Sequence, residues 1–296
     1  MMADDYPTPR DLYLEANRLR LHLLDWSRAD ATGDPVLLLH GLMEHAHAWD
    51  LVAPALAAAR LRVFALDWRG HGESEWIGRG GYYHFADYVA DLGFVVRALG
   101  GRVALVGHSM GGNAALTYAG TEPERVRALA SIEGLGPPDS APDDAPDRFR
   151  GWLGDLERTA ERRPRVIALA DAAQLLAERF PLWTPEVARH MALHGTRAAG
   201  ADDVRIWRFD PLHQTRSPQP FYAAQARAFW RRMRCPVLYV QGTRSFISAA
   251  PLEIDQRVEA LGARRSTIAD AGHHPHLERP EATASVLLEF LRTALA

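Results

Sequence analysis

The feature that most constrains this chain is a repeated alternation of short apolar runs with longer amphipathic stretches. Apolar runs of about four residues, ending in loop residues such as Gly or Asp, are typical of strands buried on both faces of a sheet. The chain contains the runs Val36–Leu39, Val63–Leu66, Val103–Val106, Leu129–Ile132 and Val237–Val240, with a last strand expected at Arg265–Ile268.

The stretches between these runs have the spacing of amphipathic helices. In Pro280–Leu295, apolar residues recur at helical intervals and a proline suits the first turn. Further helices are predicted at Trp49–Ala59, Phe85–Leu99 and Met110–Gly120. This order predicts an α/β fold, with a mostly parallel, twisted sheet and helices on both faces. Leu12–Glu15 and Leu19–Asp25 alternate in polarity and predict an antiparallel edge pair.

The alternation breaks between residues 137 and 233. This segment opens with the Pro- and Asp-rich stretch PPDSAPDDAPD and then has an almost entirely helical pattern. We therefore expect a core of residues 1–136 and 234–296, with a helical cap of residues 137–233 inserted between two core strands. The segment holds half of the chain's 8 tryptophans, which are Trp152, Trp183, Trp207 and Trp230. They either face a ligand or build a small core of the cap itself.

Composition excludes several classes of function. All 34 cationic residues are Arg, so the chain has no lysine for a P-loop, a pyridoxal-phosphate Schiff base or a lysine-dependent aldolase. The single Cys235 excludes an intramolecular disulfide, an iron–sulfur cluster and a cysteine-based zinc site. A net charge of −3 without blocks of like charge gives no indication of a nucleic-acid or membrane partner.

No targeting signal is visible in the sequence. The first ten residues, MMADDYPTPR, lack a charged region followed by an apolar one. No apolar run approaches the roughly 18 residues that a membrane span requires. We therefore expect a cytoplasmic protein that acts on a small molecule, and the sequence does not indicate an oligomeric state.

A candidate nucleophile lies between a predicted strand and a predicted helix. The residues Gly107-His108-Ser109-Met110-Gly111 form a G-x-S-x-G motif in the strand–turn–helix context that the motif requires. A sharp turn would hold Ser109 in a strained conformation with its hydroxyl exposed, and the neighbouring strand and helix would leave room only for Gly107 and Gly111. The helix N-terminus adds N–H groups and a positive dipole end.

Four motifs in this order resemble the α/β-hydrolase superfamily over nearly the whole chain. They are LLLHGLMEHAHAW (Leu37–Trp49), LDWRGHGES (Leu66–Ser74), VGHSMGG (Val106–Gly112) and AGHHPHLERP (Ala271–Pro280). Within the superfamily, SIEGLGPP and the run HGTRAAGADDVRIWRFDPLH resemble the serine hydrolase-like, or kraken-like, group. The resemblance implies an α/β-hydrolase fold without a cofactor. It also implies an oxyanion hole formed by the backbone N–H groups of Leu42 and Met110.

The resemblance indicates His273 as the catalytic base. A neutral imidazole there would take the Ser109 proton and return it to the leaving group. His274 and His276 are close rivals, with the alternative that each is a loop histidine lining the pocket. Histidines this close could also suggest a metal, as could His45 and His47. Neither group has a carboxylate at a familiar metal-site spacing, so we expect no metal site.

The acid departs from the superfamily's common pattern. Most members carry Asp in the loop that is Gly242–Phe246 here, where Ser245 stands instead. A minority, including haloalkane dehalogenases and cofactor-free dioxygenases, place the acid after the strand that follows the nucleophile helix, where this chain has Glu133. We favour Glu133, with the alternative that it caps a loop while Ser245 orients the base. Glu253 and Asp270 are further candidates, and Asp67 is expected to be structural.

These residues predict a serine hydrolase that cleaves a carboxylic ester, thioester or lactone through an acyl-enzyme. Ser at position 109 argues against epoxide hydrolases and haloalkane dehalogenases, which use a carboxylate nucleophile. The alternatives are a cofactor-free dioxygenase or lyase on the same fold, or a non-catalytic ligand receptor. His108, Trp183 and Trp207 are candidates for the substrate pocket, and the aromatic residues of the cap favour an apolar or aromatic substrate moiety.

Overall fold

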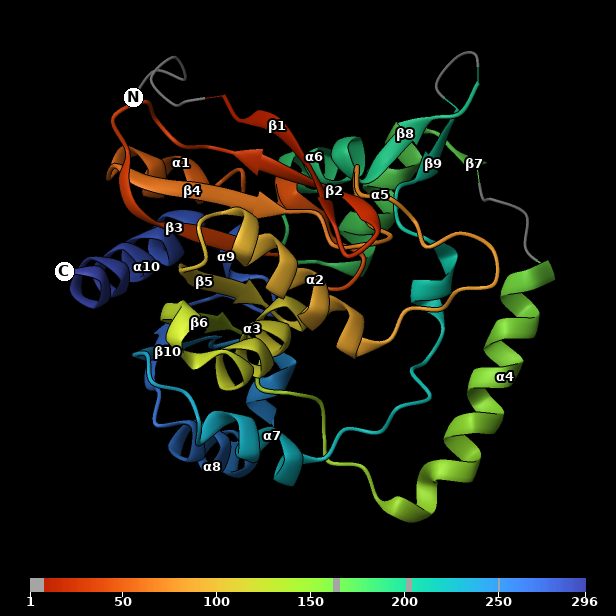
Figure 1. Cartoon of the computed structure of the whole chain (residues 1–296). Helices are drawn as coiled ribbons and strands as arrows, with labels where there is room; N and C mark the ends of the chain where they lie inside the picture. The colour runs from red at the N-terminus through yellow and green to blue at the C-terminus, as the bar shows by residue number, and fades with distance from the viewer. Residues whose placement is uncertain (1–7, 162–165, 201–203, 250) are drawn as a thin grey trace.

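The computed structural model describes residues 8–161, 166–200, 204–249 and 251–296 (Figure 1). Residues 1–7, which make up most of the segment considered for a targeting signal, lie outside these ranges. Within the described ranges, no helix has both the length and the apolar character needed to cross a bilayer.

An 8-stranded sheet runs through the centre of the molecule (Figure 1). Its strands, in spatial order, are β1 (Arg10–Ala16), β2 (Leu19–Asp25), β4 (Leu61–Leu66), β3 (Thr32–Leu39), β5 (Val103–His108), β6 (Val126–Ile132), β10 (Val237–Gly242) and β11 (Arg264–Ile268). All neighbours from β4 to β11 are parallel, whereas β1 pairs antiparallel with β2, and β2 pairs antiparallel with β4. The predicted parallel sheet and antiparallel edge pair are both confirmed.

Helices cover both faces of this sheet. Along β5, Val103 and Leu105 pack into one hydrophobic cluster, and Ala104 and Val106 pack into another on the opposite face. Burying each large aliphatic side chain stabilises the fold by about 1.5–3 kcal/mol relative to its exposure. The first cluster includes residues of α2 (Phe85–Ala98), α3 (Met110–Thr121), α7 (Ala223–Trp230) and α8 (Pro251–Leu261). The second includes residues of α1 (Ala53–Ala58) and α10 (Pro280–Leu295).

The predicted helix Trp49–Ala59 begins later than expected. Its first residue, Trp49, is the last residue of a separate 3-10 turn, η2 (Ala46–Trp49), and α1 begins only at Ala53. Pro54 explains the difference, because proline lacks the N–H that a preceding helical turn would need and fits only near a helix start.

The sequence predicted an almost entirely helical segment between β6 and β10. The structure differs, because this segment also carries a second sheet. Its helices are α4 (Ala145–Glu161), α5 (Leu169–Arg179), α6 (Pro185–Gly195) and α7, with the 3-10 turns η4 (Pro142–Asp144) and η5 (Pro211–Gln214). The small antiparallel sheet has the order β7 (Val166–Ile167), β9 (Arg205–Trp207), β8 (Thr196–Ala198). Strands of two or three residues are too short to show an alternating pattern in sequence.

The inserted segment has parts with different surroundings (Figure 1). Helix α4 lies at the outside of the molecule, away from the central sheet, whereas α5 and α6 lie close to the small sheet. Helix α7 packs against α3, and its Trp230 belongs to the core cluster on that face of the central sheet.

Candidate active site

Ser109 lies at the sharp turn that joins β5 to α3. Its backbone has φ 50° and ψ −113°, a conformation that costs on the order of 1–3 kcal/mol for a residue with a side chain. A Cβ atom at Gly107 would lie 2.5 Å from the Gly111 backbone, and one at Gly111 would lie 2.3 Å from the Leu39 carbonyl oxygen. The two glycines are therefore required by close approach of the backbone, as the sequence predicted.

His273 lies between the two other residues that the sequence singled out. It occupies the loop between β11 and the short helix α9 (Pro275–Glu278). Its Nε2 atom lies 3.2 Å from Ser109 Oγ, and its Nδ1 atom lies 3.2 Å from Glu133 Oε2. The His273 side chain is 19% exposed, whereas the Glu133 side chain is fully buried. The structure thus brings the three side chains together at the carboxyl ends of neighbouring strands.

Glu133 is held by two further hydrogen bonds. It directly follows β6, with φ 56°. The backbone N–H of Gly242 donates to Oε1 at 2.7 Å, and the Ser245 hydroxyl donates to Oε2 at 2.5 Å. The sequence left open that Ser245 orients His273 directly. In the structure, the Ser245 hydroxyl instead donates to Glu133, the carboxylate that faces His273. These donors hold the carboxylate in one orientation toward the imidazole.

The other acids considered from the sequence have different surroundings. Glu253 pairs with Arg257 one turn further along α8. Asp270 lies in an exposed turn, where its backbone N–H donates to the Thr243 hydroxyl. Asp67 is buried and its carboxylate accepts bonds from the backbone N–H groups of Ala46 and Glu73, which agrees with the structural role expected of it.

Two backbone N–H groups lie where the resemblance expects an oxyanion hole. Met110 is the first residue of α3, and such a position has no intrahelical acceptor for its N–H. Leu42 lies in the loop after β3, between Gly41, whose N–H donates to Glu44 Oε2, and Met43, whose N–H donates to His71 Nε2. Within the described part of the chain, the Leu42 N–H has no acceptor of its own.

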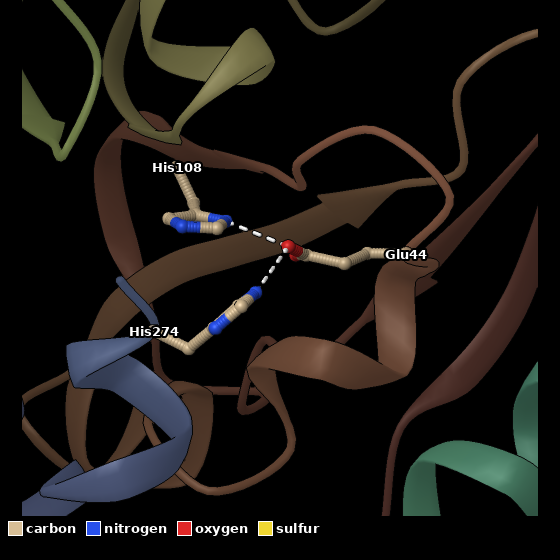
Figure 2. A group of neighbouring side chains, drawn as sticks. All are labelled: Glu44, His108 and His274. Atoms are coloured by element: carbon tan, nitrogen blue, oxygen red, sulfur yellow. Dashed lines mark ion pairs between the residues drawn. The ribbon is translucent and has the colours of Figure 1, made fainter. Parts of the chain in front are cut away.

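Behind these residues lies a buried carboxylate, Glu44, that the sequence did not single out. Figure 2 shows that its side chain points between the rings of His108 and His274. Glu44 Oε1 lies 2.8 Å from His108 Nδ1 and 3.5 Å from His274 Nε2. Its other oxygen accepts the Gly41 N–H at 3.0 Å and lies 3.7 Å from His276 Nε2. One carboxylate therefore connects the loop after β3, the turn that carries Ser109 and the loop of His273.

The charges in this buried group support each other. Burial alone would raise the pKa of Glu44, but His108 and His276 hold it well below its usual value. Burial opposes protonation of His108, yet the adjacent Glu44 carboxylate raises the His108 pKa. The Nε2 atom of His108 also lies 2.7 Å from the carbonyl oxygen of His273, to which a protonated ring donates. His276 is different, because burial lowers its pKa to about 4 and keeps it neutral.

The structure distinguishes the three residues that were candidates for a substrate pocket. His108 is fully buried, so its side chain contacts protein groups rather than lining a pocket. Trp183 stacks on Phe180 with 4.3 Å between ring centroids, and both rings meet the edge of His274. Trp207 lies in β9 and packs with a small cluster inside the inserted segment.

An exposed aromatic residue that sequence reasoning missed lies beside His273. Phe246 follows Ser245 directly and is 70% exposed. Its ring centroid lies 4.7 Å from that of His273. Only its position at the end of the loop expected to carry an acid could have singled it out from the sequence.

Comparisons with known proteins agree with this geometry. Residues 34–280 match the family described as the alpha/beta hydrolase fold, so the chain belongs to the α/β-hydrolase family. It is 26% identical over 273 residues to a serine hydrolase-like protein of Danio rerio, covering 88% of this chain and 82% of that protein. The expected resemblance to the serine hydrolase-like group is thereby confirmed.

Two solved structures are similar over nearly their whole length. A hypothetical protein from Pseudomonas aeruginosa PAO1 has a TM-score of 0.84 and 30% identity, covering 95% of this chain and 97% of that one. A thioesterase domain from the curacin biosynthetic pathway has a TM-score of 0.81 and 26% identity, covering 95% of this chain and 99% of that domain. Together with the family match, these likenesses confirm the α/β-hydrolase fold and support a hydrolase as the general class.

Proposed function

We propose that the protein is a serine hydrolase that cleaves a carboxylic ester, thioester or lactone through an acyl-enzyme. Ser109 is the nucleophile, His273 the general base and Glu133 the acid that orients it. The observation that carries the proposal is the position of the His273 ring, with one nitrogen 3.2 Å from Ser109 Oγ and the other 3.2 Å from a Glu133 oxygen. A base between a nucleophile and an orienting carboxylate is the arrangement that acyl transfer requires.

In the first half of the reaction, His273 Nε2 accepts the hydroxyl proton as Ser109 Oγ attacks the carbonyl carbon. The negative charge that develops on the carbonyl oxygen is stabilised by the N–H groups of Leu42 and Met110, at about 3 kcal/mol for each preset donor. The tetrahedral intermediate collapses, and the leaving alcohol or thiol takes the proton from the imidazolium.

In the second half, water replaces the departed group. His273 takes a proton from this water as its oxygen attacks the acyl carbon, and the same proton then returns to Ser109 as the carboxylic acid leaves. Glu133 accepts a hydrogen bond from His273 Nδ1 throughout, which keeps Nε2 as the proton acceptor and stabilises the imidazolium. The Ser245 hydroxyl and the Gly242 N–H, both bonded to Glu133, support this orientation.

We propose that an apolar or aromatic part of the substrate binds beside Phe246. An exposed aromatic ring next to the base would cost free energy in water, and a ligand would cover it. In this proposal the inserted segment serves as the cap, with Trp183 reaching toward the base loop through its contact with His274.

Labelling with a fluorophosphonate probe tests the proposed function. A serine hydrolase should be labelled at Ser109, and S109A should remain unlabelled while keeping its circular dichroism spectrum. Wild-type protein that is folded but unlabelled would instead favour a cofactor-free dioxygenase or lyase, or a non-catalytic ligand receptor. Hydrolysis of p-nitrophenyl acetate would separate an enzyme from a receptor in the same preparation.

A further inference from the structure

A second group of ligating side chains lies where the inserted segment meets the core, and it shares no residue with the candidate active site. His47 lies in η2 and Asp50 directly follows that turn, so both belong to the core. His190 and His194 lie in α6 of the inserted segment. Their spacing of four residues places both on one face of the helix.

The atoms of this group are close enough to share an ion. One ligating atom from each of His47, Asp50 and His194 lies within 4.8 Å of the others. His47 Nδ1 is 2.8 Å from Asp50 Oδ2, and the rings of His47 and His194 stack with 3.7 Å between centroids. Tetrahedral zinc, with bonds of about 2.0–2.1 Å, holds its ligand atoms about 3.3 Å apart. Small inward movements of the side chains would complete such a site.

Asp50 supplies a second, independent observation. Its Oδ1 atom is buried and has no hydrogen-bond partner among the described residues. A buried carboxylate oxygen without a donor is costly. A bound cation would satisfy it.

The group is accessible from solvent. The side chains of His47 and Asp50 are 23% and 16% exposed, so an ion can enter from solvent. His190 Nε2 lies 3.3 Å from Asp50 Oδ2 and 3.1 Å from the His47 carbonyl oxygen, which places it as a support for Asp50.

We propose that His47, Asp50 and His194 bind one divalent transition-metal ion of the zinc class, with His190 positioning Asp50. Two imidazoles and a carboxylate are donors that this class prefers. The ion would join α6 of the inserted segment to the core and so stabilise their contact. The sequence predicted no metal because His194, the ligand from α6, lies more than a hundred residues beyond His47.

Another group with similar donors, the Glu44, His108 and His274 cluster of Figure 2, is a weaker candidate. All three residues are buried, which leaves no entry for an ion. Both oxygens of Glu44 also have close partners, His108 Nδ1 and the Gly41 N–H, whereas Asp50 Oδ1 has none among the described residues.

Zinc titration of the full-length, tag-free protein after chelation tests the proposal. Calorimetry should give one zinc ion per chain, and zinc should raise Tm. Cobalt in place of zinc should give the visible absorption of a tetrahedral site. H194Q and D50N should each lower the affinity by at least about tenfold. H190Q should have a smaller effect, because His190 acts through Asp50.

H84Q is the matched control, since His84 directly precedes α2 and belongs to neither group of candidate ligands. It should bind zinc as the wild type does. Absence of binding at excess zinc would overturn the proposal. So would undiminished binding by both H194Q and H47Q, which would assign the ion to the cluster of Figure 2. If D50N does not fold, the zinc affinities of H47Q and H194Q test the proposal, and circular dichroism spectra show whether these two variants are folded.

Discussion

The loops at the carboxyl ends of the central strands and the inserted segment are built by different means. In the core, hydrogen bonds continue past the strands into the site. The Ser109 N–H donates to the Ile132 carbonyl and the Glu133 N–H donates to that of Val240, each at 2.9 Å. In the inserted segment, strands have only two or three residues, and contact with the loop of His273 comes from the Phe180 and Trp183 rings on His274.

This difference indicates that the core loops position the reacting atoms and that the inserted segment recognises the substrate. Backbone hydrogen bonding in a parallel sheet fixes atoms to within a few tenths of an ångström, which bond-making chemistry needs. Side-chain packing from a separate segment tolerates variation and suits recognition of a substrate. We therefore expect changes in the core loops to act on rate and changes in the inserted segment to act on selectivity.

The largest effect should come from Ser109. S109A removes only the hydroxyl, so kcat for ester hydrolysis should fall by about 10⁶-fold while the fold is kept. Steady-state hydrolysis of p-nitrophenyl acetate measures the loss, and an unchanged melting curve is the control. Residual activity near that of the wild type would contradict the assignment of the nucleophile.

Substitution of Glu133 should cause the second-largest loss of kcat. E133Q keeps the shape but removes the charge that stabilises the imidazolium, so kcat should fall by about 10⁴-fold. S245A removes a donor to Glu133 and should stay within about tenfold of wild type, because the carboxylate keeps its charge and its hydrogen bond from the Gly242 N–H.

The double variant E133Q/S245D sharpens this test. The Ser245 hydroxyl oxygen lies 2.5 Å from Glu133 Oε2, so a carboxylate at position 245 should approach the same side of His273 and restore part of the lost rate. An E133Q enzyme with near-full activity would move the acid elsewhere, with Asp270 and Glu253 as the next candidates.

Glu44 should have an intermediate effect, because it acts through other residues. E44Q removes the charge that pairs with His108 and so loosens both the nucleophile turn and the base loop. A displacement of about 1 Å in such groups costs about 10²-fold, and we expect a loss of that order in kcat with a smaller change in KM. Fluorophosphonate labelling of Ser109 should persist but become slower. Rates equal to wild type in folded E44Q would show that the buried pair is not needed to position the site.

Substitutions in the inserted segment should have smaller effects on kcat and larger effects on the preference between ester substrates. W183A removes a ring that contacts His274, so the ratio of kcat/KM between aromatic and short aliphatic esters should change by about 10-fold. W207A is the matched variant, because Trp207 packs within the segment's own cluster and should lower Tm without changing that ratio. If both variants lose stability and keep their selectivity, Trp183 is also a packing residue.

The smallest effect concerns the contact between the two regions. His213 of η5 is buried and stacks on His71 of the core with 4.0 Å between ring centroids. Burial lowers the pKa of His213 to about 3. In the unfolded chain its pKa is about 6.5. Between these values only the unfolded state takes up the proton, so the free energy of unfolding falls as pH decreases below about 6.5, by up to about 1.4 kcal/mol per pH unit.

Urea midpoints at pH 7 and pH 5 measure this loss. H213Q cannot take up a proton in either state, so its midpoint should fall less between the two pH values than that of the wild type. An equal fall in both proteins would assign the acid sensitivity to other buried histidines, such as His276 in the core.

The sequence predicted the regular elements best where local rules are strong. The bounds of Leu19–Asp25 and Pro280–Leu295 agree with the structure, because alternation in one and a proline at the start of the other are local signals. The strands β7, β8 and β9 were missed because each is held by pairing with another part of the inserted segment rather than by its own pattern. Glu44 was missed for a related reason, since His108 and His274 approach it from distant parts of the chain.

By itself, the sequence determined the alternating α/β order, the strained turn at Ser109 and the two glycines that allow it. These depend on backbone conformation and on steric contact between elements that follow each other directly. Only the tertiary structure decided that Ser245 bonds Glu133, that His108 points into the protein, and that α6 brings His194 to His47. Such contacts depend on which strands become neighbours and on how an insertion packs against them, and side chains separated by a hundred residues carry no local signal of that meeting.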